Sequence, residues 1–111
     1  MKSIALALLI LCAAACTTPT DAPDSTANDA DAVGRAAVLT MGKRAFEVHC
    51  ARCHGPDGKD ETYPFIARLD GIGKRMTPAE ILEATWASGF VSPRSMNEDE
   101  RYALGQYVAT L

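Results

Sequence analysis

Three stretches of the chain place apolar residues at the spacing of an α-helix, and none alternates apolar and polar residues as a strand does. The first stretch runs from about residue 35 to His49. Its apolar positions recur every three to four residues, which predicts one helix with an apolar face on the rest of the protein. We expect Met41 to lie in the core. The positions are Ala37, Val38, Met41, Ala45 and Val48.

Two further helices are predicted by their start signals. The segment 77–80, TPAE, supplies an N-cap threonine, a proline at the first helical position and a glutamate that completes a capping box. Gly89 provides a stop for this helix. Asn97 and Glu100 form a second capping box, and acidic residues favour the positive end of the helix that follows. The apolar stripe of this last helix is Leu104, Tyr107, Val108 and Leu111.

The segment 55–75 is punctuated by glycine and proline and is predicted to be irregular. The fold class is therefore all-α. A chain of 111 residues makes one small domain at most. Three short helices form a thin core, so we expect another group to fill the centre of the bundle.

The N-terminal residues 1–15 have the pattern of a secretory signal peptide. Lys2 precedes an apolar run from Ile4 to Leu11, which is too short to span a membrane as a mature helix. The segment 13–16, AAAC, resembles a bacterial lipobox, which predicts a lipid on Cys16. An ordinary soluble secretion signal is the alternative. If cleavage precedes Cys16, Cys50 and Cys53 are the one remaining cysteine pair, which is too few for a disulfide scaffold.

Residues 16–34 contain no aromatic residue and are rich in small and acidic ones, so this segment is predicted to be a flexible acidic tether. The folded domain then covers residues 35–111. The net charge of −3 provides no basic excess, and nothing indicates nucleic-acid binding. The charged residues of the tether are Asp21, Asp24, Asp29 and Asp31.

The candidate chemistry is concentrated in Cys50, Cys53 and His54. A redox disulfide would place its C-x-x-C motif at the start of a helix beside a sheet, whereas this motif ends a helix and leaves His54 unexplained. A zinc site that also used His49 would crowd four ligands into six residues, and no second ligand pair follows. The spacing C-x-x-C-H is the signature of covalent haem attachment, which takes place outside the bacterial cytoplasm. The motif and the export signal therefore agree.

Residues 35–111 resemble a class I c-type cytochrome, a small all-α fold wrapped around one covalently attached haem c. The segments GKRAFEVHCARCHGPDGKD, TPAEILEATWASG and NEDERYALGQYVATL carry the resemblance. It implies that Cys50 and Cys53 form thioethers to haem and that His54 is the proximal iron ligand. It also implies that the first and last helices cross closely at Gly42, Phe46 and Tyr107.

The resemblance further implies a backbone carbonyl that accepts from the proximal imidazole, and Pro64 is the best match, with a simple loop stiffener as the alternative. Arg68 is a candidate cation for a haem propionate, as are Lys74 and Arg75, although solvated surface charge is the alternative for all three. His49 is expected to end the first helix and not to bind iron. Trp86 is expected to pack in the core.

The sixth iron ligand is assigned by position. In the family it lies between the third and the last helix, where Met96 is the only sulfur. Met96 also stands where a hydrophobic staple residue would, which leaves an open distal site as the alternative. Met76 and Met41 are the other methionines after the signal segment.

These inferences predict a lipid-anchored, periplasm-facing electron carrier of the bacterial cell envelope. It would act between redox protein partners and would not be an enzyme. One alternative is a haem-based sensor or weak peroxidase with an open distal site. Another is an electron-transfer subunit of a larger membrane oxidoreductase.

Overall fold

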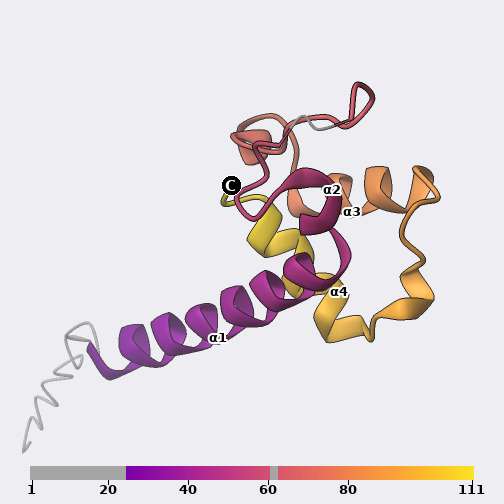
Figure 1. The fold of residues 1–111 in the computed structure, drawn as a ribbon. Helices are drawn as coiled ribbons and strands as arrows, with labels where there is room; N and C mark the ends of the chain where they lie inside the picture. The colour runs from indigo at the N-terminus through magenta and orange to yellow at the C-terminus, as the bar shows by residue number, and fades with distance from the viewer. Residues whose placement is uncertain (1–24, 61–62) are drawn as a thin grey trace, which may run out of the picture.

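The computed structural model describes residues 25–60 and 63–111, and within these residues it contains helices and no strand (Figure 1). The all-α prediction is therefore confirmed. Three α-helices are long enough to build a core, and α4 packs against both α1 and α3. The elements in chain order are α1 (Ser25–His49), α2 (Ala51–His54), η1 (Ile72–Lys74), α3 (Pro78–Ala87), η2 (Pro93–Ser95) and α4 (Glu98–Val108).

Helix α1 begins at Ser25, earlier than the predicted start at residue 35, so residues 25–34 of the predicted tether are helical. No proline interrupts the chain between Pro23 and Pro56, and alanine, the best helix former, recurs through the first half of α1. The side chains from Asp29 to Ala37 are exposed, and Figure 1 shows the N-terminal part of α1 extending away from the other helices. The predicted signal segment 1–15 and Cys16 lie outside the described residues.

Helices α1 and α4 cross in close contact, and this crossing determines how the helices of the domain are arranged. A Cβ atom on Gly42 would overlap the backbone of Ala103 and lie 2.6 Å from Cβ of Tyr107. The rings of Phe46 and Tyr107 pack with centroids 5.6 Å apart at an interplanar angle of 56°. The prediction that these helices cross closely at a glycine and two aromatic residues is confirmed.

The core is small and centred on Phe46, which is fully buried. Met41 and Val48 are exposed, so the prediction that Met41 lies in the core was wrong. Each residue turns a helix by about 100°, and α4 covers the narrow face of α1 that carries Gly42 and Phe46. Met41 lies beside that face and lines an open groove at the start of α4, where 42% of its surface stays exposed. The buried apolar side chains are Ala45, Phe46, Ile81, Met96, Ala103, Leu104 and Val108.

Both predicted capping boxes are present. The Thr77 hydroxyl accepts from the Glu80 backbone N–H, and Asn97 accepts in the same way from Glu100. Helix α3 then packs on α4 where Gly105 leaves room for Leu82. Trp86 packs against the core as predicted. Among the described residues, no helix combines the length and apolar character needed to cross a membrane.

Candidate functional site

The two cysteines and His54 lie on one tight turn that follows the end of α1. Helix α1 ends at His49, as predicted, and the single-turn helix α2 begins at Ala51. The backbone carbonyl of Cys50 accepts from the N–H groups of both Cys53 and His54, each at 3.0 Å. This turn brings the two sulfur-bearing residues and the imidazole together in one local unit. Both thiols are free.

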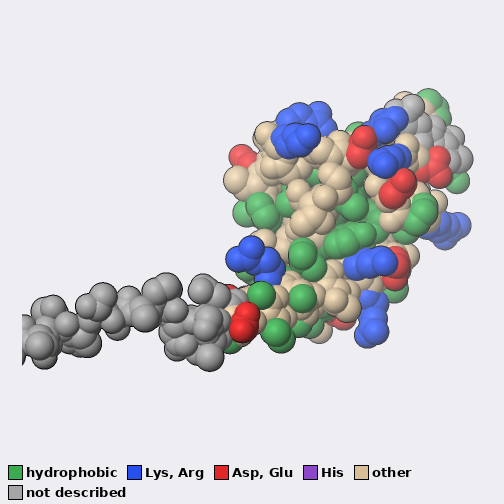
Figure 2. All heavy atoms as spheres, turned by 90° about the vertical axis from the view of Figure 1, so that its left-hand side faces the viewer, with side chains coloured by type: hydrophobic (Ala, Val, Ile, Leu, Met, Phe, Trp, Pro, Cys, Tyr) green, Lys and Arg blue, Asp and Glu red, His purple; other side chains and the backbone are tan. Residues whose placement is uncertain are grey.

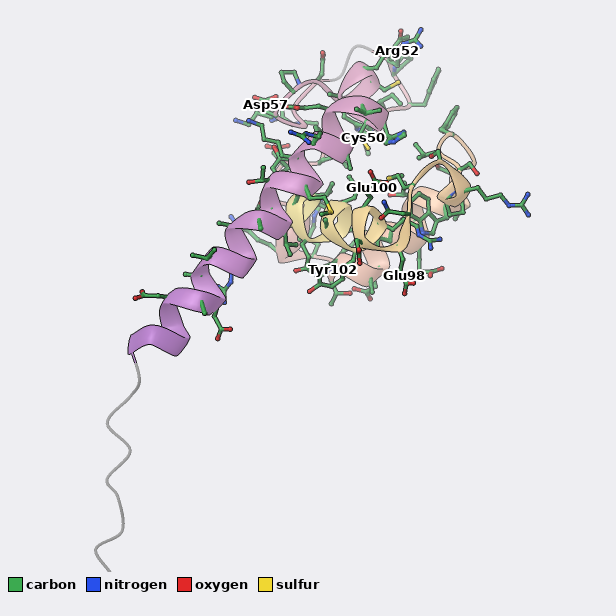
Figure 3. All side chains as sticks on the ribbon, turned by 90° about the horizontal axis from the view of Figure 1, so that it is seen from below. Cys50, Arg52, Asp57, Glu98, Glu100 and Tyr102 are labelled. Atoms are coloured by element: carbon green, nitrogen blue, oxygen red, sulfur yellow. The ribbon has the colours of Figure 1, made fainter. Side chains whose placement is uncertain are left out.

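Cys50 lies at the inner side of this turn. It is partly buried and packs against the hydrophobic core, whereas Arg52 in the same turn is exposed (Figure 3). Burial raises the pKa of the Cys50 thiol to about 11, and the neighbouring Cys53 contributes to the rise. A redox-active disulfide site lowers the pKa of its thiol instead. The environment of Cys50 thus argues against the disulfide alternative.

The imidazole of His54 is oriented by a backbone carbonyl. Its Nδ1 lies 3.0 Å from the carbonyl oxygen of Ala67. A carbonyl oxygen only accepts, so this bond requires the proton on Nδ1 and leaves the Nε2 lone pair of a neutral ring available to a metal. A bond of this kind fixes the orientation of a metal-binding imidazole and raises its donor strength.

The acceptor is therefore Ala67, and the assignment of this role to Pro64 was wrong. The loop that follows the motif turns back, so that residues further along the chain lie beside His54. The Asp60 N–H donates to the His54 carbonyl at 3.0 Å, and the Leu69 N–H donates to the Gly58 carbonyl at 2.8 Å. These two bonds bring residue 67, further along than the proline, beside the ring. No sequence signal marks Ala67, because a backbone carbonyl is common to every residue.

Pro64 and Arg68 line one open groove of about 470 Å³, together with Ala67 and Arg75. The Arg68 guanidinium donates two bonds of 2.9 Å to the carboxylate of Asp70. This contact holds the pKa of Asp70 below its usual range. A haem propionate at Arg68 would share the guanidinium with Asp70, and that contact stays a prediction. Lys74 is exposed.

Of the three methionines in the described residues, Met96 is the most deeply buried, with 6% of its surface exposed. It lies between η2 and α4 and belongs to the core cluster against which Cys50 packs. Met76 is partly buried against the same cluster, and 42% of Met41 is exposed. The assignment of Met96 as an iron ligand stays a prediction.

The residues of the turn fit a haem held by two thioethers and one imidazole. Two thiols share a turn, one of them faces the core, and the adjacent imidazole keeps a nitrogen lone pair for iron. Among residues 25–60 and 63–111, no three or more His, Cys, Asp or Glu side chains are grouped to hold a metal ion by themselves. An iron that arrives within a porphyrin needs only the imidazole and one further ligand from the protein.

Comparison with known proteins gives one result. The family model described as cytochrome c matches residues 39–111, which covers well over half of the chain and includes the whole C-x-x-C-H turn. None of the curated proteins compared with the chain matches it, and neither does any of the solved structures.

Proposed function

The chain belongs to the cytochrome c family, and from that premise we propose that it is a membrane-anchored carrier of single electrons whose haem domain faces the periplasm. The family binds haem c covalently, so Cys50 and Cys53 hold the haem and His54 ligates its iron. The bound iron supplies one-electron redox chemistry. The protein is accordingly a haem electron-transfer protein.

The contact between His54 and Ala67 is the observation that carries the proposal of a carrier. Electron transfer is fast when the iron site changes little between its two oxidation states, and a ligand with a fixed orientation limits that change. The carbonyl of Ala67 holds the imidazole at 3.0 Å, and backbone bonds on the loop hold the carbonyl in turn. Met96, buried in the core, is the proposed second ligand.

The proposed membrane anchor is a lipid on Cys16. The lipobox-like segment 13–16 and the apolar run before it support this anchor. Residues 25–41 of α1 form a rod of about 25 Å at 1.5 Å per residue. A rod of this length would hold the haem domain away from the lipid surface, where redox protein partners could dock with it.

The test is expression of the full chain in a bacterium that has haem-attachment machinery. We expect the mature protein to sediment with membranes, to show the visible spectrum of a c-type haem and to carry the mass of one haem plus the lipid. Cys16→Ser should release a haem-loaded protein into the soluble periplasmic fraction. Cys50→Ala with Cys53→Ala should leave a lipidated protein without covalent haem.

The two variants separate the parts of the proposal. A Cys16→Ser protein that stays on the membrane would contradict the lipid anchor but leave the electron carrier intact. A wild-type protein that carries no covalent haem would contradict the carrier. Isolation of the haem-loaded protein from membranes together with a dehydrogenase or an oxidase would identify the partner class.

A further inference from the structure

The chain beyond α4 lies against the loop that holds the proximal imidazole. Helix α4 ends at Val108, which is buried, and one further turn follows, in which the Leu111 N–H donates to the Val108 carbonyl at 3.2 Å. Figure 1 shows this end of the chain beside the loop that follows α2. Because α4 packs against both α1 and α3, Leu111 is attached to the helix that holds the domain together.

Leu111 contacts this loop at two points. The Gly71 N–H donates to the backbone carbonyl of Leu111 at 2.6 Å. The side chain of Leu111 packs at Gly58, where an added Cβ atom would lie 3.0 Å from both Leu111 Cδ1 and Leu69 Cβ. Leu69 and Leu111 are both partly buried against the hydrophobic core. The loop is thus held to α4 near both of its ends, at Gly58 and at Gly71.

A third contact joins η1 to the end of α4. A Cβ atom on Gly73 would overlap the backbone carbonyl of Ala109, so the two backbones approach as closely as a glycine allows. Gly73 is not among the glycines with a positive φ. The absence of a side chain is therefore required by this contact and not by the backbone conformation.

These contacts lie close in sequence to the residue that orients His54. Ala67 is exposed and lines an open groove, so packing of its own side chain does not fix its carbonyl. Leu69, two residues further on, is bonded through its N–H to the carbonyl of Gly58, the residue against which Leu111 packs. The position of the Ala67 carbonyl therefore depends on how firmly Leu111 holds the loop.

We propose that Leu111 is a positioning residue for the proximal iron ligand. It holds the loop against α4 and so keeps the carbonyl of Ala67 within hydrogen-bond distance of the Nδ1 atom of His54. The inference rests on the haem site of the proposed function, where His54 ligates the iron. A bond to a backbone carbonyl raises the donor strength of a metal-binding imidazole. Loss of the Leu111 contact should therefore loosen this bond, weaken the ligand and favour ferrous iron.

The test compares Leu111→Ala with the wild type, both as the haem-loaded full chain. The variant removes the side chain that packs at Gly58. We expect the Nδ1 proton of His54 and the amide proton of Leu69 to exchange with solvent about tenfold faster, as measured by NMR, because the loop opens more often. Redox titration should show a higher reduction potential.

Two further variants test the same contact from both sides. Gly73→Ala should shift the exchange rate and the potential in the same direction as Leu111→Ala, since its Cβ would displace η1 from the carbonyl of Ala109. Leu111→Met keeps most of the apolar volume at this position, so the exchange rate and the potential should remain those of the wild type.

Leu82→Ala is the matched control. Leu82 is partly buried, as Leu111 is, but it packs on Gly105 where α3 meets α4. This variant should lose a similar amount of stability and keep the wild-type exchange rate of the Nδ1 proton and the wild-type potential. Figure 2 shows hydrophobic side chains among charged ones on α1 close to the grey segment. Val33→Ala truncates a side chain of α1 that is 70% exposed and should change neither stability nor potential.

Two results would overturn the inference and leave the proposed electron carrier intact. One is a haem-loaded Leu111→Ala protein with the wild-type exchange rate and potential. The other is an equal change in Leu111→Ala and Leu82→Ala, because lost stability alone would then explain both. A wild-type chain without covalent haem would contradict the electron carrier and this inference together.

Discussion

The imidazole of His54 and the backbone carbonyl of Ala67, which are 13 positions apart in the sequence, are joined by a hydrogen bond of 3.0 Å. The loop between them is held by the bond from the Leu69 N–H to the Gly58 carbonyl. The orientation of the proximal ligand thus depends on how this loop folds, and not on a side chain beside the ring. A substitution at Gly58 should therefore change the iron site without contacting the imidazole.

We expect Gly58→Ala to raise the reduction potential of the haem-loaded protein. Gly58 has a φ of +72°, and a Cβ there would lie 3.0 Å from both Cβ of Leu69 and Cδ1 of Leu111, so we expect the loop to shift at Leu69 and the nearby bond between His54 and Ala67 to lengthen. A weaker bond lowers the donor strength of the imidazole and favours ferrous iron. Redox titration measures the potential, and NMR of the Nδ1 proton reports the bond.

The matched control is Gly89→Ala. Gly89 has a φ of +73°, and a Cβ on it would meet no atom within 4 Å. This variant carries a similar backbone penalty, about 1 kcal/mol, but does not touch the His54 loop. Its potential should remain that of the wild type. Equal shifts in the two variants would show that lost stability, and not the His54 contact, changes the potential.

Replacement of two glycines of α1 by alanine should change the free energy of unfolding in opposite directions. Gly42→Ala should lower the free energy of unfolding by about 1–3 kcal/mol, because its Cβ would overlap the backbone of Ala103 in α4. Gly34→Ala should raise it by about 0.5–1 kcal/mol, since Gly34 is helical, exposed and has nothing within 4 Å. Chemical denaturation of the haem-loaded protein measures both. A Gly34 variant as unstable as the Gly42 variant would contradict the packing described for the crossing.

The sequence predicted those features of the fold that depend on residues close together in the chain, or on residues that match a known family. The capping boxes at Thr77 and Asn97 require only residues three apart in the chain. The crossing at Gly42 was implied by the resemblance to class I c-type cytochromes, in which a small residue and an aromatic one pack where the first and last helices cross. The turn that carries Cys50 and His54 is likewise local, and the motif defines it.

The remaining features depend on distant parts of the chain. Periodicity predicted an apolar face on α1 but not how much of that face α4 covers. Met41 was therefore placed in the core, although 42% of its surface is exposed at an open groove beside the start of α4. The start of α1 was placed too late because acidic composition suggested disorder, while the alanine content favours a helix. Ala67 could not be found, because its role depends on the backbone bonds from Asp60 to His54 and from Leu69 to Gly58, which no local pattern predicts.

The capping box of α3 should make stability depend on acid pH. Glu80 accepts from the backbone N–H of Thr77 at 2.8 Å, and the hydroxyl of Thr77 also donates to it, so the pKa of Glu80 is lowered. A carboxylate with a lowered pKa stabilises the fold above its ordinary pKa of about 4.3 and loses this effect as the pH falls through the folded value. The difference in unfolding free energy between wild type and Glu80→Gln should therefore shrink on acidification.

Glu83→Gln is the control for this experiment. Glu83 lies in the same helix and is exposed, and its side chain makes no hydrogen bond or ion pair with the described residues. Its difference from wild type should not depend on pH. A Glu80→Gln difference that stays constant between about pH 6 and pH 3 would contradict the contribution of the ionised carboxylate.

Met96 is predicted to be the second axial ligand, and three leucine substitutions compare it with the other methionines. Leucine preserves most of the volume of methionine but removes the sulfur, so each variant should cost less than about 1.5 kcal/mol of stability. Met96→Leu should abolish the sulfur-to-iron charge-transfer band of the ferric protein and lower its reduction potential, because a thioether ligand raises it. Met76→Leu and Met41→Leu should leave both the charge-transfer band and the reduction potential unchanged.

The burial of Met96 makes this comparison decisive. Its side chain belongs to the core cluster that Cys50 also contacts, while Met41 lies on an exposed face and Met76 at the edge of the cluster. A band that survives in Met96→Leu and is lost in Met76→Leu would transfer the role of ligand to Met76. A wild-type ferric protein without the band, whose ferrous form binds carbon monoxide rapidly, would instead favour an open distal site and a sensor function.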